Sequence, residues 1–442
     1  MTIRMDEGAA ELLDTLHRAG YAAYVVGGCV RDSLLGLTPH DWDLCTSALP
    51  QQGMELFGEE KCIPTGLQHG TVTVKQGGGL YEITTFRTEG AYTDGRHPDE
   101  VHFVPDVRED LARRDFTINA MAYNAKEGLV DPFGGQADLQ SGVLRAVGVP
   151  HQRFTEDALR ILRLYRFAAR FGFSIDPPTA QAAQELCAHL DCVSVERIEE
   201  ELAKLLSAPA PAAYLDKKIL GVVLPELSPE ALAAAKPVVD ACPAGEQALP
   251  VRLAALLLSL GEDGTRRTLR RLRCSNACIE ETAVLVREVV SGVPGAFSSD
   301  TNRAIPSPAL LPAATGSHPS GRSSEKLPAR PPVSLNIYTR KLLGKYNLCT
   351  VQRLAALGTA LQPEHAADFA ALSELAERLD ADGVCCCVSQ LAVNGRDLMA
   401  AGVPAGPGIR KILEALLDGV IREEYPNERQ ALLTAVQQLA AS

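Results

Sequence analysis

Short apolar runs separated by turns characterise the N-terminal part of the chain. Apolar residues that alternate or run together predict strands, because side chains along a strand repeat with a period of two. These runs lie at 21–26, 70–74, 80–86 and 101–104. Helical patches and turn residues lie between them, so this part of the chain is predicted to be an α+β domain.

Helical spacing replaces the strand pattern further along the chain. Apolar residues then recur every three or four positions, which predicts helices. The predicted helical segments are 156–171, 178–190, 195–206, 251–260, 338–346, 351–361, 407–420 and 428–439. Between the fourth and the fifth, residues 292–332 are rich in Pro, Ser, Gly and Ala and hold few large apolar side chains, which predicts a linker or a flexible insertion.

Composition narrows the classes of function. A net charge of −12 argues against a protein that coats nucleic acid over its whole surface, although it leaves room for a local basic groove. No apolar run is long enough to span a bilayer and no signal-peptide pattern follows Met1, so we expect a soluble, cytoplasmic protein without a membrane partner. The twelve cysteines are scattered, which favours reduced thiols over disulfides or a zinc knuckle.

The most informative segment joins a glycine turn to two aspartates. Gly27-Gly28 follows an apolar strand and precedes a helix, so a phosphate can approach its backbone N–H groups. Asp41 and Asp43 follow in a predicted extended segment, where alternate side chains share one face. Two adjacent carboxylates repel each other unless a cation lies between them, and their oxygens suit Mg²⁺. An isolated Asp-x-Asp is more often a polar surface strand, but the glycine turn and Arg31 upstream favour metal-assisted nucleotidyl transfer.

Other candidates lie in the same predicted domain. Glu82, in a predicted strand, is a candidate third carboxylate; the alternative is an ordinary surface glutamate of an alternating strand. Arg113 and Arg114 precede an apolar helical stretch, where one of them could clamp a triphosphate. The alternative for this pair is two surface cations bonded to Asp110 or Asp115.

A row of charged residues marks the predicted helix that begins near Thr155. Its members recur about three residues apart, so they drift slowly around one helical face. One explanation is structural, with Thr155 as the helix cap and the arginines as solvated surface charges. That explanation does not account for so many aligned arginines in an acidic protein. The row comprises Asp157, Arg160, Arg163, Arg166 and Arg170.

Asp157 and Arg160 together complement one type of base edge. Cytosine and adenine both present an exocyclic amino donor beside a ring-nitrogen acceptor, which a carboxylate and a guanidinium match. Uracil and guanine reverse this pattern and would leave buried polar groups unpaired. The pair therefore predicts that C and A are accepted and that U and G are refused.

Basic residues that could contact RNA phosphates lie further along the chain. They are Arg267, Arg270 and Arg271 in a helical stretch, with Lys341 and Lys345 beyond the predicted insertion. The alternative is a solvated helix face, since exposed arginines often cluster without any ligand.

In their residues and order, these segments resemble the bacterial class II CCA-adding tRNA nucleotidyltransferases, in the superfamily that also contains bacterial poly(A) polymerases. The matching stretches are 26–32, 41–43, 66–71, 82–87, 113–120, 131–135 and 156–160, with weaker matches at 391–398 and 402–407. The resemblance implies a nucleotidyltransferase-fold head with a mixed sheet, followed by an all-α neck, body and tail. The implied parts are the catalytic head (1–150), the neck for base recognition and RNA binding (151–207), the body (208–291), the linker or insertion (292–332) and the tRNA-binding tail (333–442).

The resemblance also implies an activity. It is the template-independent addition of CCA to the 3′ end of tRNA from CTP and ATP, with Mg²⁺ as cofactor and pyrophosphate as the leaving product. By this likeness Asp41 and Asp43 bind the metal, and Asp157 and Arg160 are the amino-acid template. Nucleotide contacts are implied for Gly28, Arg31, Arg114, Arg163 and Arg166.

Several other functions are compatible with these motifs. A poly(A) polymerase, or an enzyme that adds only part of CCA, would carry most of the same motifs. A non-catalytic RNA-binding protein with this fold is less favoured, because both Asp41 and Asp43 are present. The chain lacks a His-Asp pair beyond His151, so we expect no phosphohydrolase activity. The sequence does not predict the oligomeric state.

Overall fold

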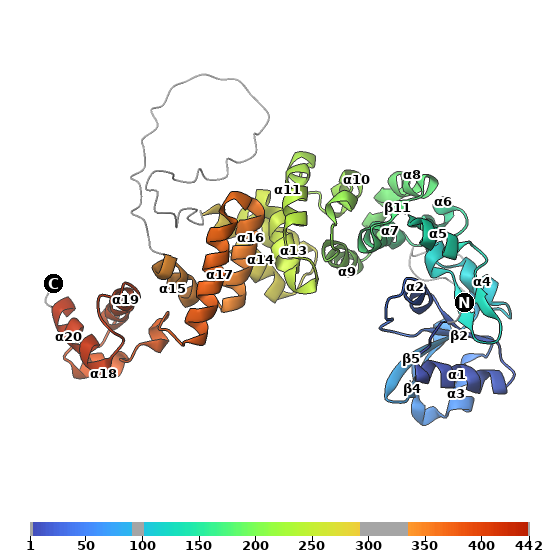
Figure 1. Cartoon of the computed structure of the whole chain (residues 1–442), viewed down its shortest axis with the longest axis horizontal. Helices are drawn as coiled ribbons and strands as arrows, with labels where there is room; N and C mark the ends of the chain where they lie inside the picture. The colour runs from blue at the N-terminus through green and yellow to red at the C-terminus, as the bar shows by residue number, and fades with distance from the viewer. Residues whose placement is uncertain (1–2, 91–100, 292–334, 441–442) are drawn as a thin grey trace, which may run out of the picture. The chain divides into compact units, whose positions relative to one another are not determined.

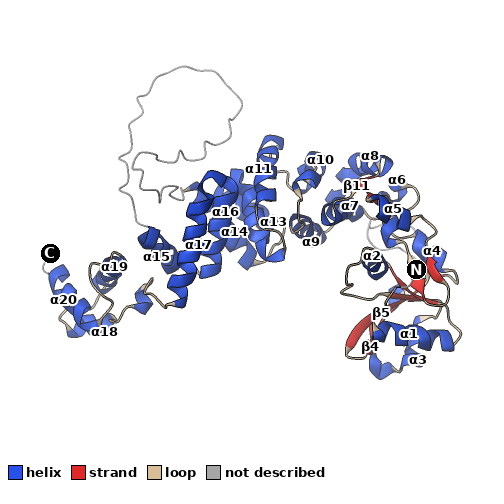
Figure 2. Ribbon diagram, in the orientation of Figure 1, coloured by secondary structure: helices blue, strands red, loops and turns tan. Residues whose placement is uncertain are grey.

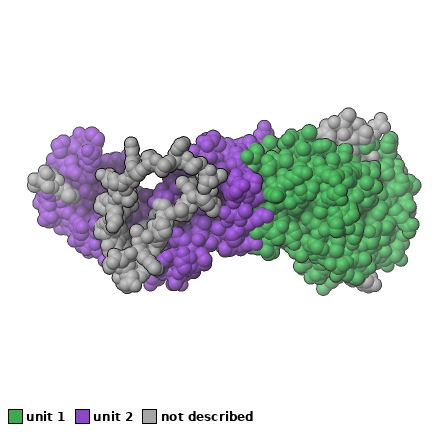
Figure 3. Space-filling view, turned by 90° about the horizontal axis from the view of Figure 1, so that it is seen from above, with its two compact units in different colours: residues 1–225 green, residues 226–442 purple. Residues whose placement is uncertain are grey.

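The computed structural model describes residues 3–90, 101–291 and 335–440 (Figure 1). The chain forms two compact units, residues 1–225 and 226–442 (Figure 3). The predicted insertion at 292–332 lies outside the described residues. In the described ranges, no helix is long and apolar enough to cross a membrane. The division into five parts stays a prediction, and helix α10 (Lys217–Val223), expected in the body, falls within the first unit.

A seven-stranded mixed sheet forms the centre of the head (Figure 2), with strand order β3-β4-β5-β2-β1-β8-β9. Strands β2 and β5 run parallel, and the other neighbours in this sheet are antiparallel. The prediction of an α+β head with a mixed sheet is therefore confirmed. Its strands are β1 (Ala23–Val26), β2 (Leu44–Thr46), β3 (Cys62–Gly66), β4 (Thr71–Gln76), β5 (Gly79–Thr85), β8 (Ala122–Asn124) and β9 (Gly128–Val130).

Two short strand pairs lie outside this sheet. Strand β6 (Arg87–Glu89) pairs with β7 (Val101–Phe103), and β10 (Val143–Leu144) pairs with β11 (Ser174–Ile175). Residues 91–100, which follow β6 and precede β7 in the chain, lie outside the part of the chain that the structure describes.

The register of the central strands determines which side chains reach the surface. Leu44 of β2 pairs with Val25 of β1 on one side and with Ile83 of β5 on the other. All three side chains are buried. Because successive side chains on a strand point to opposite faces, the residues just before Leu44 and Ile83 point away from this core. These residues are Asp43 and Glu82, and both are exposed.

Helices surround the sheet and continue beyond it. Helix α1 packs against β1 and β2, and α3 packs against β4 (Figure 1). The N-terminus of α1 is capped by Asp6, whose carboxylate accepts the N–H groups of Gly8 and Ala9. Besides α10, the α-helices of this unit are α1 (Glu7–Arg18), α2 (Gly28–Leu34), α3 (Pro50–Phe57), α4 (Val107–Ala112), α5 (Gly135–Ser141), α6 (Pro150–Glu156), α7 (Leu159–Phe171), α8 (Pro177–Leu186) and α9 (Val195–Leu206).

The helix predicted at 156–171 begins later than expected, at Leu159, and a short break separates it from the helix before it. Helix α6 ends at Glu156 and α7 begins at Leu159, while Asp157 has extended backbone angles (φ −144°, ψ 104°). The Asp157 carboxylate accepts the N–H of Leu159 at 3.1 Å, an orphan donor of the first turn. Thr155 is therefore no cap of this helix, and its hydroxyl donates to the carbonyl of His151 within α6. Apolar spacing continued through the break, so periodicity alone could not reveal it.

The second unit is helical throughout its described part, as predicted. Helix α13 packs on α14, and α16 packs on α17. A separate apolar core joins the last three helices through Leu398, Leu416 and Leu432. The helices are α11 (Pro229–Ala241), α12 (Leu249–Leu257), α13 (Gly261–Arg271), α14 (Asn276–Val290), α15 (Leu335–Lys345), α16 (Leu348–Leu361), α17 (Ala366–Ala381), α18 (Gly395–Ala400), α19 (Gly408–Ile421) and α20 (Arg429–Ala440).

Candidate active site

The glycine turn and the aspartate pair meet where β1 ends. The Val26 N–H donates to the Asp43 carbonyl at 2.9 Å, and the Gly27 N–H donates to the Met121 carbonyl at 3.0 Å. Gly27 has a φ of 79°, which glycine adopts without steric cost. Helix α2 then begins at Gly28. Asp41 and Asp43 lie in the segment that leads into β2 rather than in the strand itself, so Asp43 stands directly beside the turn.

Three carboxylates approach one another at Asp43. Asp43 reaches solvent, yet the protein packed around it raises the pKa of its carboxyl group. Arg114 lowers this pKa, whereas Glu82 and Asp41 raise it further. Among the described residues, no three His, Cys, Asp or Glu side chains are already arranged as a closed metal site. The oxygen donors fit a divalent cation that takes its other ligands from water or from a triphosphate.

Arg114 reaches the same turn. Its Nη2 lies 3.4 Å from Oδ2 of Asp110, and its Nη1 would lie 2.8 Å from a Cβ placed on Gly27. The Nε of Arg114 is buried and has no hydrogen-bond partner among the described residues. A guanidinium with an uncommitted donor beside a glycine turn is well suited to bind phosphate oxygens.

Arg31 is buried, with an exposed fraction of 4 %. Its Nε donates to Asp32 at 2.7 Å and its Nη1 donates to Asn119 at 2.6 Å. The guanidinium also lies over the rings of Phe167 and Phe171, at 5.2 and 5.0 Å from their centroids. These contacts make Arg31 a support of helix α2. Its contact with a nucleotide stays a prediction, and would require one of these bonds to open.

Asp157 is held by Arg197, a residue with no recognisable signal in the sequence. One carboxylate oxygen accepts from Leu159, and the other accepts from Nη2 of Arg197 in α9 at 2.8 Å. Forty positions separate Asp157 from Arg197, so local spacing gave no signal of this pair.

Arg160 lies one turn further along, with an exposed fraction of 9 %. Its Nη1 donates to the Arg153 carbonyl at 3.0 Å and to Glu156 at 2.6 Å. Its Nη2 donates to the Arg113 carbonyl at 3.2 Å. In this structure the polar side-chain atoms of both Asp157 and Arg160 therefore bond to other groups of the protein.

Arg163 and Arg166 are anchored by two buried carboxylates. Arg163 donates to Asp115 through Nε and Nη2, at 2.9 and 2.7 Å, and Nε of Arg166 lies 2.6 Å from Glu201. Burial alone would raise the pKa of Asp115, but Arg163 holds it well below the usual carboxyl range. Arg166 also lies over the Phe167 ring, 3.7 Å from its centroid. The alternative of solvated surface arginines therefore does not hold for Arg163 and Arg166, which are paired with carboxylates, whereas Arg170 at the end of the row is exposed and lies 3.4 Å from Asp32. Glu201 was missed for the same reason as Arg197.

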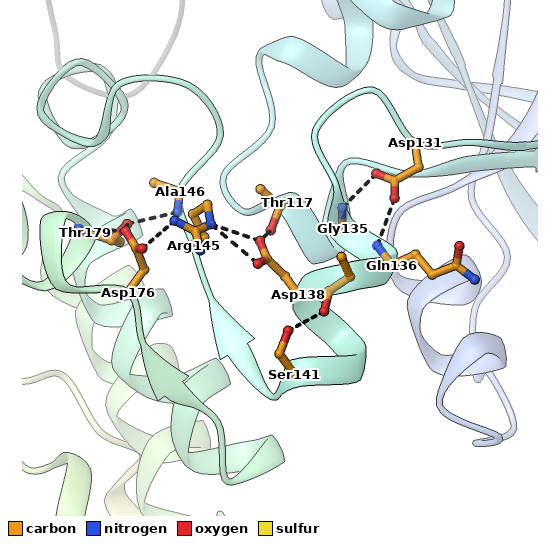
Figure 4. A network of polar contacts seen from close by, with 11 residues as sticks. Thr117, Asp131, Gly135, Gln136, Asp138, Ser141, Arg145, Ala146, Asp176 and Thr179 are labelled. Carbon is orange, nitrogen blue, oxygen red and sulfur yellow. Dashed lines mark hydrogen bonds and ion pairs between the residues drawn. The ribbon is translucent and has the colours of Figure 1, made fainter.

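A polar network supports the segment 115–119 through Thr117 (Figure 4). The Thr117 hydroxyl donates to Asp138 of α5 at 2.7 Å. Asp138 in turn pairs with Arg145 at 3.2 Å, and Arg145 also pairs with Asp176. Asp115 begins this segment and contacts Arg163, and Asn119 ends it and contacts Arg31. The network therefore fixes the segment that makes both contacts.

The start of α5 is set by Asp131 (Figure 4). Its two carboxylate oxygens accept the N–H groups of Gly135 and Gln136, at 2.7 and 2.9 Å. The stretch 131–135, which carries part of the family resemblance, thus acts as a helix-capping turn in this structure.

The basic residues of α13 differ in their surroundings. Arg271 is held by Glu226 through two hydrogen bonds, at 2.6 and 2.8 Å. Arg267 and Arg270 are exposed, and neither forms an ion pair with a described residue. These two arginines are therefore the better candidates for RNA phosphates.

The basic residues of α15 divide in the same way. Lys341 pairs with Asp418 of α19 at 2.8 Å. Lys345 is exposed near the C-terminal end of α15. RNA binding by either lysine stays a prediction.

Neutralising Arg267 and Arg270 together should flatten the salt dependence of RNA binding. Each lost phosphate contact removes about 0.7 to 0.9 from the slope of log affinity against log salt. Arg271→Gln is the matched control, because Glu226 already occupies that guanidinium, and its slope should stay near that of the unaltered protein. An unchanged slope in the Arg267→Gln/Arg270→Gln variant would place the RNA on another surface.

Comparison with known proteins adds to this geometry. A family model described as the poly A polymerase head domain matches residues 23–145. A model described as an RNA- and SrmB-binding site of polymerase A matches 172–230, and one for tRNA nucleotidyltransferase domain 2 matches 338–436.

Similar proteins extend over nearly the whole chain. A CCA-adding enzyme of Lactiplantibacillus plantarum is 35% identical, covering 99% of this chain and 97% of its own length. A second, from Lactobacillus delbrueckii subsp. bulgaricus, is 37% identical, covering 96% of each chain. The crystal structure of a Bacillus stearothermophilus CCA-adding enzyme in complex with CTP matches with a TM-score of 0.76 at 28% identity, covering 99% of this chain and 98% of the other.

Proposed function

The chain belongs to the CCA-adding enzyme family, and we propose that Asp41 and Asp43 beside the Gly27-Gly28 turn form its reaction centre. Its activity is the addition of CCA to the 3′ end of tRNA. The enzyme uses CTP and ATP without a nucleic-acid template. In the reaction the 3′ hydroxyl oxygen of the RNA attacks the α-phosphate, a new phosphodiester bond forms, and pyrophosphate leaves. The observation that supports the proposed centre is the meeting of Asp43, the glycine turn and Arg114 at the end of β1.

Nucleotidyltransferases of this family generally depend on a divalent metal. We propose that Asp41 and Asp43 hold Mg²⁺, with Glu82 as a neighbouring carboxylate. When bound, the metal would lower the pKa of the attacking hydroxyl and neutralise charge on the leaving pyrophosphate. The raised pKa of Asp43 agrees with carboxylates that gain from a cation between them.

The triphosphate is assigned to the turn and to Arg114. Backbone N–H groups at the start of α2, including that of Gly28, lie beside the Asp43 segment. Arg114 adds a guanidinium whose buried Nε has no hydrogen-bond partner in the described part of the chain. Arg163 and Arg166 contribute positive charge on α7, held in place by Asp115 and Glu201.

Base choice is assigned to Asp157 and Arg160. A carboxylate acceptor and a guanidinium donor complement the Watson–Crick edges of C and A. Asp157 is bonded to Arg197, and Arg160 is bonded to Glu156, so a bound base would have to exchange some of these contacts for its own. We also propose a cytoplasmic location, because the tRNA that the enzyme completes is used in the cytoplasm.

An incorporation assay tests the proposal. The protein is incubated with tRNA that lacks CCA, Mg²⁺ and labelled CTP or ATP, and label should enter the tRNA only when a divalent cation is present. A protein that bound tRNA and incorporated neither nucleotide would be a non-catalytic relative. Incorporation unaffected by a metal chelator would refute the metal role of Asp41 and Asp43.

Removing residues 90–95 should separate C addition from A addition. By the family resemblance, residues 88–98 correspond to a segment that accompanies the switch from C to A addition and that enzymes adding only CC lack. The strands β6 and β7 bracket this loop, so its removal should leave the sheet and Asp43 intact. The expected product is tRNA that ends in CC, and normal addition of the terminal A would contradict the role of the loop.

A further inference from the structure

One buried carboxylate, Asp110 of α4, holds the arginine that faces the glycine turn. Its exposed fraction is 0 %. Oδ1 of Asp110 accepts from Nε and Nη2 of Arg113, at 3.0 and 2.8 Å, and Oδ2 accepts from Nη2 of Arg114 at 3.4 Å. Burial by itself would raise the pKa of the Asp110 carboxyl, but the two guanidinium groups hold it below its ordinary value. Asp110 therefore stays ionised, and it offsets two neighbouring positive charges.

The guanidinium of Arg114 spans from this carboxylate to the turn. Its Nη2 lies on Asp110, whereas its Nη1 lies against Gly27, where an added Cβ would approach it to 2.8 Å. Arg114 is also close enough to Asp43 to lower the pKa of that carboxyl. One end of the guanidinium is thus fixed inside the protein, and the other end faces the place where phosphates would lie.

Asp110 makes a third contact, with the backbone. Its Oδ1 accepts the N–H of Arg87 at 3.4 Å. Arg87 begins β6 two residues after the end of β5, and β5 carries Glu82. The same carboxylate therefore joins Arg114 to the backbone just beyond β5, the strand that places Glu82 beside Asp43.

We propose that Asp110 is a positioning residue for the triphosphate, acting through Arg114. This inference rests on the nucleotide-binding role assigned to Arg114 above. A long arginine side chain loses rotamer freedom when it binds a ligand, and a partner that fixes the side chain beforehand removes this cost from binding. Without the carboxylate, Arg113 and Arg114 would repel each other, and Arg114 would leave the turn.

A double-mutant cycle tests the inference, with Asp110→Asn and Arg114→Ala measured separately and together. Asp110→Asn should raise the Michaelis constants for CTP and ATP about tenfold, a typical effect for loss of a hydrogen bond to a charged group, and leave that for tRNA unchanged. In the Arg114→Ala background it should have no further effect, because the group through which it acts is gone. The matched control is Asp176→Asn, which removes another buried carboxylate bonded to an arginine. Any fold increase that it causes in the nucleotide Michaelis constants should multiply with the fold increase caused by Arg114→Ala.

Asp110→Glu serves where Asp110→Asn does not fold, because it keeps a negative charge between the two arginines and moves it by one methylene. It should give a smaller increase of the same Michaelis constants, again absent in the Arg114→Ala background. If Arg114→Ala alone leaves the nucleotide constants unchanged, the role of Arg114 fails, and the inference fails with it. If Arg114→Ala raises the nucleotide Michaelis constants and the Asp110 variants raise them by a further factor in that background, Arg114 binds nucleotide. Only the positioning role of Asp110 is then overturned.

Discussion

Asp43→Ala and Asp41→Ala should each abolish nucleotide incorporation while leaving tRNA affinity nearly unchanged. Removal of a key electrostatic group in an active site typically costs about a hundredfold to a thousandfold in rate, and these carboxylates are assigned the metal. Contacts that hold tRNA go to its phosphates and shape, and neither of these carboxylates is a candidate for such a contact. The measurement is single-turnover incorporation of CTP, with tRNA binding measured in parallel.

Asp14→Asn is the control for these variants. Asp14 is an exposed carboxylate on α1, paired with Arg18 at 2.9 Å, and no contact among the described residues links it to the turn. It should keep full activity. Residual turnover above about one per cent in Asp41→Ala or Asp43→Ala would fall outside the loss expected for such a group and would remove it from the reaction centre.

Asp157→Ala should relax base choice more than it weakens triphosphate binding. A buried polar group left unpaired costs about 1 to 3 kcal/mol, so discrimination against UTP and GTP should fall by roughly tenfold to a hundredfold. Triphosphate binding should change less, because Arg163 and Arg166 are held by Asp115 and Glu201 rather than by Asp157. The measurement is the ratio of kcat/KM values for CTP and UTP, and for ATP and GTP.

Asp157→Asn sharpens this prediction. An amide offers a donor as well as an acceptor, so it can pair with the O4 acceptor of uracil that a carboxylate refuses. Asp157→Asn should therefore accept UTP more readily than Asp157→Ala does. If both variants kept the original preference for CTP and ATP, base choice would reside elsewhere.

Local sequence patterns were sufficient for much of the fold. The apolar run at 80–86 corresponds to β5, and the segment 195–206 corresponds to α9 residue for residue. The glycine turn was also found from its sequence, because Gly27 needs a positive φ that few other residues adopt. Such features depend on neighbours within a few positions, which a periodicity or a turn signal records.

The partners of the site residues could not be found in this way. Arg197 reaches Asp157 from another helix, and Glu201 reaches Arg166 across a comparable separation in the chain. Each of these pairs depends on how α7 packs against α9, which local spacing does not specify. The burial of Arg31 was missed for the same reason, because Asn119 and the two phenylalanines beneath it come from elements far along the chain.

The most direct test of the account is to sequence the 3′ ends that the protein makes. Transfer RNA that lacks its terminal CCA is incubated with the protein, Mg²⁺ and all four nucleoside triphosphates, and the extended ends are read. The account predicts ends that stop at CCA, with U and G absent. Tails of repeated A, ends that stop at CC, or no extension at all would contradict it.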